Sequence, residues 1–245
     1  IDALCETAAL TFAMSALLFG GALKQNASSG MTGDSTTCST CRSDFRESIR
    51  HLFQNASLLV VFLLAAILNL ALVGLTIGAP VIVAKHLGMQ SSFVGIIEVA
   101  MGLGGLVGSG LVGIWPHRFS FKGICRYVAM ICFGVVPIIV TLLSGPDELA
   151  FAALAAGSAW VMAWASIASV EIVSFVQRSA PKELCGKVLA LVYMTLSCAT
   201  PIGQLVYGLA YDRWTPAIVF AGMLAVLTLT TALFYRLKNR LWRLP

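Results

Sequence analysis

Seven apolar stretches of about 20 residues each follow one another along this chain. A helix of that length crosses a hydrocarbon core of roughly 30 Å, and a backbone in lipid must form its hydrogen bonds within itself. With 58% hydrophobic residues, 11% charged residues and a mean hydropathy of +0.89, the chain also lies outside the range of soluble globular domains. We therefore predict an all-α integral membrane protein whose spans are residues 3–22, 58–79, 93–114, 124–143, 149–173, 188–210 and 217–235.

The basic residues predict how these spans are oriented. Lysine and arginine in short loops stay on the cytoplasmic side of a membrane. Of the 16 lysines and arginines, all but Lys85 and Arg213 fall in alternate loops. Those loops are residues 24–50, 118–126, 178–187 and 236–243. The sequence thus predicts a multi-pass protein whose first residues lie outside and whose C-terminus lies in the cytoplasm.

A long polar segment separates the first span from the other six. Residues 24–57 are rich in Ser, Thr and Gly and then basic, a composition typical of a cytoplasmic linker. Short turns join the six spans that follow, so we expect residues 58–245 to pack as one six-helix bundle. The chain opens directly at a span, so we expect it to be a truncation of a longer transporter. Residues 1–23 would then be the last helix of a preceding bundle.

Glycines crowd the span at residues 93–114. Gly104 and Gly108 form a GxxxG pair, and Gly102 and Gly105 lie beside them. Small residues let helix backbones approach closely, which favours helix packing in lipid. The sequence predicts a close helix contact here, and it leaves open whether that contact is rigid or rocks during transport.

Among the polar side chains within the apolar spans, Asn69, Glu98 and Glu171 are candidates for a function. An ionised side chain deep in a membrane is costly and normally faces a cavity or a partner, so Glu98 is a candidate carrier of a coupling proton or contact for a cationic substrate. The alternative is that Glu98 lies shallow enough in its span to reach water. Asn69 needs a partner in lipid, which is either another helix or a substrate. Glu171 lies near the cytoplasmic end of its span, seven residues before Arg178, as an interfacial charge or half of a gating ion pair.

Motifs for catalysis, metals and cofactors are missing from the sequence. It contains no Walker A loop, no HExxH and no GxSxG, and its three histidines fall in loops. Cys38 and Cys41 form a single CxxC with no second pair and no nearby histidines to complete a zinc site. We therefore expect no enzyme, no catalytic residue, no bound metal, no cofactor and no nucleic-acid partner.

The segment "VQRSAPKELCGKVLAL" resembles the connection between the tenth and eleventh helices of major facilitator superfamily exporters of the macrolide-efflux and enterobactin-exporter type. The matching residues are Gln177, Pro181, Glu183, Gly186 and Lys187. The segments "IDALCETAALTFAMSALLF", "HLGMQSSFVGIIEVAMGLGGLVGSGLVG" and "PIGQLVYGLAYDRW" are similar to the sixth helix, the eighth helix and the end of the eleventh.

This resemblance implies a major facilitator superfamily fold, of which the chain holds helix six and the C-terminal six-helix bundle. Residues 177–187 would form a cytoplasmic hairpin in which Pro181 stops the helix and Gly186 allows a tight turn. Arg178, Lys182 and Lys187 would anchor it at the cytoplasmic face. By resemblance, such hairpins contact helix ends differently in the inward-open and outward-open states; the alternative is that the hairpin serves only as a topology anchor.

The function implied is export of small amphipathic molecules from a bacterial cell by alternating access in the plasma membrane, driven by proton entry. The partners would be the lipid bilayer, the substrate, protons and the missing N-terminal bundle. Two alternatives stay open. One is a proton-coupled uptake carrier of the same fold, and the other is a membrane pore or sensor.

Overall fold

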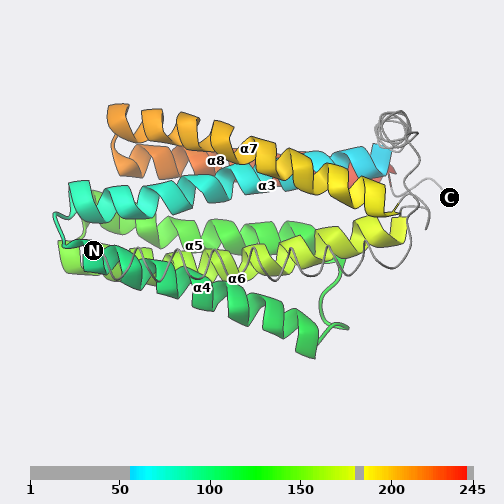
Figure 1. Ribbon diagram of the computed structural model, residues 1–245, viewed down its shortest axis with the longest axis horizontal. Helices are drawn as coiled ribbons and strands as arrows, with labels where there is room; N and C mark the ends of the chain where they lie inside the picture. Colours follow the sequence, from blue (N-terminus) through cyan, green and yellow to red (C-terminus); the bar gives the residue numbers. More distant parts are fainter. Residues whose placement is uncertain (1–55, 180–184, 242–245) are drawn as a thin grey trace, which may run out of the picture. The chain divides into compact units, whose positions relative to one another are not determined.

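The computed structural model describes residues 56–179 and 185–241, and this part of the chain contains six helices long and apolar enough to cross a membrane. They are α3 (Ala56–Val81), α4 (Ser91–Ile114), α5 (Ile124–Ser144), α6 (Asp147–Ser179), α7 (Cys185–Arg213) and α8 (Pro216–Leu241) (Figure 1). The described residues contain no strand, so the predicted all-α membrane fold is confirmed. The predicted span 3–22, the predicted linker as far as residue 55, and Pro181 and Glu183 lie outside the described residues.

The helices on either side of the predicted hairpin, α6 and α7, extend beyond their apolar stretches. α6 is 33 residues long and continues beyond the apolar stretch, so Gln177 and Arg178 lie in its last turns. α7 already begins at Cys185, which places Gly186 and Lys187 in its first turn. Gly186 thus lies in a helix, whereas residues 180–184 lie outside the described residues, so the predicted hairpin stays a prediction. Polar residues ended the apolar stretch, but they did not end the helices.

The far end of α3 is shaped by a proline. Pro80 lies inside the last turn of α3, and the backbone continues into a π-helical turn, η1, at Ile82–His86. A proline lacks an N–H, and local changes of helix type can satisfy the carbonyls that it frees. The chain then reverses at Gly88, whose φ of 61° suits glycine. Lys85 lies in η1, and its Nζ is 3.0 Å from Oδ1 of Asp212, near the end of α7.

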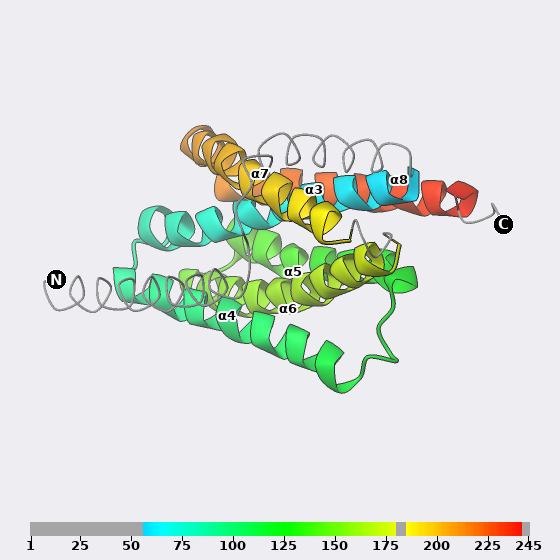
Figure 2. The same cartoon turned by 45° about the vertical axis from the view of Figure 1, so that its right-hand side comes forward.

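The six helices pack in two groups of three. α6 packs against α4 and α5, whereas α3 packs against α7 and α8, and both views show these groups as separate layers (Figures 1 and 2). α5 and α8 make the main contact between the groups, with a smaller one between α3 and α6. Because the helices alternate in direction, α3, α5 and α7 begin at the end of the bundle where α6 reaches Arg178, and they finish at the end that carries Lys85. We call these the Arg178 end and the Lys85 end.

Apolar side chains fill the space between the helices and also cover much of the outside. Leu75, Ile131 and Phe220 are fully buried in the core. Leu106 and Leu229, in contrast, are 69% and 71% exposed. An exposed apolar surface of this kind suits contact with lipid.

Two tyrosine rings of α7 pack against two glycines of α3. The ring of Tyr207 covers Gly74, and the ring of Tyr211 covers Gly78 so closely that any Cβ there would overlap it. Gly74 and Gly78 are four residues apart, as are Tyr207 and Tyr211, so the two pairs repeat one turn apart on both helices. The contact fixes α7 against α3 next to the pocket described below.

Candidate functional site

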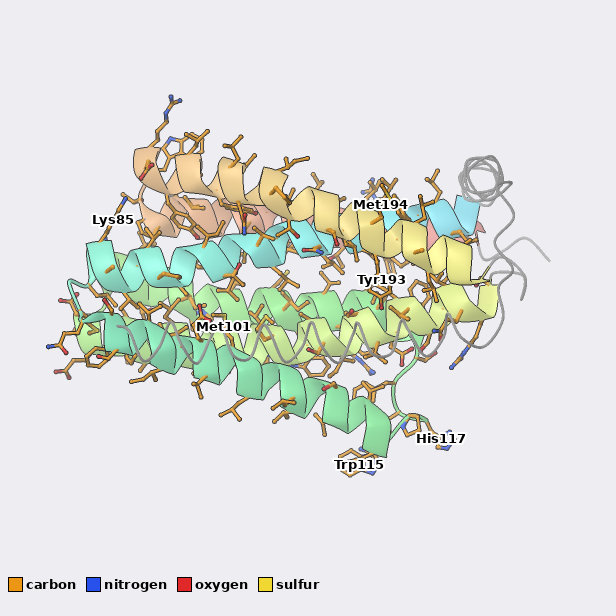
Figure 3. The ribbon with its side chains drawn as sticks, in the orientation of Figure 1. Lys85, Met101, Trp115, His117, Tyr193 and Met194 are labelled. Carbon is orange, nitrogen blue, oxygen red and sulfur yellow. The ribbon has the colours of Figure 1, made fainter. Side chains whose placement is uncertain are left out.

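A pocket of about 670 Å³, counted with its open mouth, lies between α3, α6 and α7. Its wall is mostly aliphatic, with Leu68 and Leu72 from α3, and Ile131 of α5 also lines it. Three polar residues line it, one from each of the three helices: Asn69 of α3, Ser169 of α6 and Tyr193 of α7. In Figure 3, Tyr193 extends from α7 toward α6.

The polar groups of these three residues make no hydrogen bond to other described residues. Hydroxyls elsewhere in the same helices bond to their own backbone: Thr76 donates to the carbonyl of Val73 at 3.0 Å, and Thr200 to that of Leu196 at 3.1 Å. A polar group inside a membrane needs a partner. An amide and two hydroxyls are thus available to a molecule bound in the pocket.

A comparison with family models identifies the family of this chain. Residues 7–243 match the family described as transmembrane secretion effector, a branch of the major facilitator superfamily. The chain belongs to that family. The comparisons with curated proteins and with solved structures found no match. Membership supports a multi-pass membrane protein and a transporter, as the sequence predicted.

Of the two intramembrane residues predicted to contact substrate or protons, only Asn69 lines the pocket of this secretion effector. Glu98 lies on α4, which contributes nothing to the pocket wall, and its side chain is exposed. It forms no ion pair within the described part of the chain, where Lys85 and Asp212 form one. The structure therefore does not bring Asn69 and Glu98 together, and the roles predicted for them stay predictions.

The four predicted packing glycines of α4 differ in how closely they approach α6. Gly104 and Gly108 lie against α6, where an added Cβ would overlap the carbonyl oxygens of Ala159 and Ala163. An added Cβ on Gly105 would lie 3.4 Å from the Ser166 hydroxyl, and around Gly102 there is open space. The contact between α4 and α6 thus depends on Gly104 and Gly108. A gating role for this glycine-rich helix stays a prediction.

Glu171 is predicted from the sequence to be either an interfacial charge or half of a gating ion pair. Its side chain is only 8% exposed, and its carboxylate is attracted by the backbone N–H of Phe121 in the short η2 turn (Phe121–Gly123) before α5. The ring of Phe121 stacks on Phe175 of α6 at a centroid distance of 4.2 Å. Arg178 attracts the carboxylate without forming a close ion pair. Glu171 therefore fastens the η2 turn to α6 at the Arg178 end.

Sequence reasoning missed Ser169, Tyr193 and the pairing of Gly74 with Tyr207. The sequence does contain a signal for the contact at Gly74. Gly74 and Gly78 form a GxxxG pair with the same spacing as Gly104 and Gly108. Ser169 and Tyr193 gave no such signal. Serine and tyrosine are ordinary in membrane helices, and only the tertiary packing joins them to Asn69.

Proposed function

We propose that this secretion effector exports small amphipathic molecules from a bacterial cell by alternating access in the plasma membrane, with proton entry as the driving force. The pocket between α3, α6 and α7 carries the proposal, because it combines an aliphatic wall with three unpartnered polar groups. Ligand sites of transporters occur near the bilayer midplane between helix bundles, and sites for small molecules are mostly apolar with a few placed polar groups.

The proposed orientation puts the Arg178 end in the cytoplasm. Arg118, Arg126 and Arg178 lie at or near this end, outside the apolar parts of the helices. At the other end, Lys85 is paired with Asp212 and thus contributes less net positive charge. This distribution supports a cytoplasmic Arg178 end, since basic residues stay inside.

We propose that a second bundle completes the pocket. Residues 1–23 would be the last helix of that bundle, residues 24–57 a cytoplasmic linker, and residues 58–245 the bundle described here. The pocket is open on one side, which supports a site shared with a partner bundle. The residues 177–187 would then contact helix ends of the partner as the transporter changes state.

Direction and coupling can be tested in cells that make the full-length protein containing this chain. Cells are loaded with Nile red, an uncharged amphipathic dye, and its loss is followed after glucose is added. We expect faster loss than in cells without the protein, and a return to the background rate with a protonophore. Faster dye accumulation would instead indicate an uptake carrier, and flux that is insensitive to the protonophore would favour a pore.

A further inference from the structure

We infer that the pocket selects uncharged molecules that carry a hydrogen-bonding oxygen, and that it discriminates against organic cations. The inference rests on the proposed function, because it names the substrate class of the same site. The juxtaposition that carries it is Asn69, Ser169 and Tyr193 on three helices around an aliphatic space without a charged side chain on its wall.

No ionised group of the described residues faces this space. Glu171 precedes the pocket residue Ile172 on α6, but it is buried outside the pocket wall, where the backbone N–H of Phe121 attracts its carboxylate. Glu98 is exposed on α4, outside the pocket wall. Arg178 lies beyond the pocket in the last turn of α6 and is exposed.

A cation that enters such a space loses water and gains no countercharge from the described residues. Removing an ion from water is unfavourable unless a charged partner and hydrogen bonds replace the water. An uncharged molecule avoids most of this loss. Its apolar surface replaces water along Leu68, Leu72 and Val173, and the unpartnered polar groups meet its oxygen atom.

The three polar side chains supply both hydrogen-bond donors and acceptors. Asn69 offers an NH₂ and a carbonyl oxygen, and the hydroxyls of Ser169 and Tyr193 each donate one hydrogen bond and accept others. A carbonyl, phosphoryl, ether or hydroxyl oxygen on the ligand can pair with them.

Two probes of similar shape separate charge from size: triphenylphosphine oxide, which is neutral with a strong acceptor oxygen, and the tetraphenylphosphonium cation. Their binding to the full-length protein in nanodiscs is measured by equilibrium dialysis of radiolabelled probe. We expect the oxide to bind at least about tenfold more tightly than the cation. Equal affinities, or tighter binding of the cation, would overturn the inference.

Two substitutions at one position locate the effect. Asn69→Leu should weaken binding of the oxide about tenfold and leave binding of the cation unchanged. Asn69→Asp supplies the missing countercharge and should strengthen binding of tetraphenylphosphonium. The control is Thr76→Asp on the same helix, outside the pocket, which should alter neither probe. If Asn69→Asp leaves cation binding unchanged in a protein that still binds the oxide, the pocket is not where charge is selected.

Failure of the inference and failure of the proposed function give different results. A protein that exports Nile red but binds the cation as well as the oxide retains the function and refutes the neutral selectivity. A protein that neither exports the dye nor binds either probe refutes both.

Discussion

The hydroxyl of Tyr211 donates a hydrogen bond to the backbone carbonyl oxygen of Gly74 at 3.0 Å, joining α7 to α3 inside the bundle. Gly74 has no Cβ, so the ring of Tyr207 lies directly on its backbone one turn away. This contact holds together two of the three helices that carry the polar residues of the pocket.

Replacing Gly74 with alanine should loosen this contact. The new methyl group would lie 2.6 Å from the Tyr207 ring, so the ring or the helix must move, and overpacking of this kind typically costs about 1–3 kcal/mol. Thermal unfolding of the full-length protein in detergent, followed by circular dichroism, should show a lower midpoint. Gly95→Ala is the matched control, because open space surrounds Gly95 on the exposed side of α4, and it should leave the midpoint unchanged or raise it slightly.

The contact between α4 and α6 should tolerate alanine less well than the contact with Tyr207. At Gly108 the obstacle is the backbone carbonyl of Ala163, which cannot rotate away as a side chain can. We expect Gly108→Ala to lower the unfolding midpoint or the yield of folded protein, whereas Gly105→Ala, which meets only the Ser166 hydroxyl at 3.4 Å, should behave like the wild type. Equal behaviour of the two variants would contradict the backbone contact.

Removing the Glu171 carboxylate should release the η2 turn. In Glu171→Ala the backbone N–H of Phe121 would lose its attraction to a negatively charged group. Limited trypsin digestion should cut faster at Lys122 or Arg126 in Glu171→Ala than in the wild type. Glu171→Gln keeps an acceptor oxygen and should be cut at a rate between the two. Identical rates in all three proteins would show that Glu171 does not hold the turn.

Glu98 should matter for coupling without mattering for ligand binding. Its carboxyl group lies within a membrane helix, outside the pocket, and forms no ion pair with the described residues. Neutralising Glu98 therefore removes a proton-binding group and leaves the pocket intact. In Glu98→Gln we expect normal binding of triphenylphosphine oxide but Nile red loss that no longer depends on the proton gradient. Glu148→Gln, at the start of α6, should behave like the wild type. Wild-type gradient dependence in Glu98→Gln would exclude Glu98 as the coupling group.

Hydropathy predicted the membrane helices well because a backbone in lipid has few alternatives to a helix. It placed the end of α6 too early, since Gln177 and Arg178 are polar and yet continue the helix. Asn69 could be singled out because it is an amide within an aliphatic run. Tyr193 could not, since its relation to Asn69 arises only when α7 packs beside α3. The burial of Glu171 could not be predicted either, because the η2 turn that covers it lies 50 residues away in the sequence.

The most direct test of the central claim compares Asn69→Leu with Thr76→Val on the same helix. Asn69 lines the pocket without a partner, whereas the Thr76 hydroxyl is already bonded to Val73 and lies outside the pocket. Energised export of Nile red is measured at equal amounts of each full-length protein in the membrane. If the pocket is the substrate site, Asn69→Leu lowers the export rate about tenfold and Thr76→Val leaves it unchanged. Wild-type export by Asn69→Leu would show that the substrate passes elsewhere.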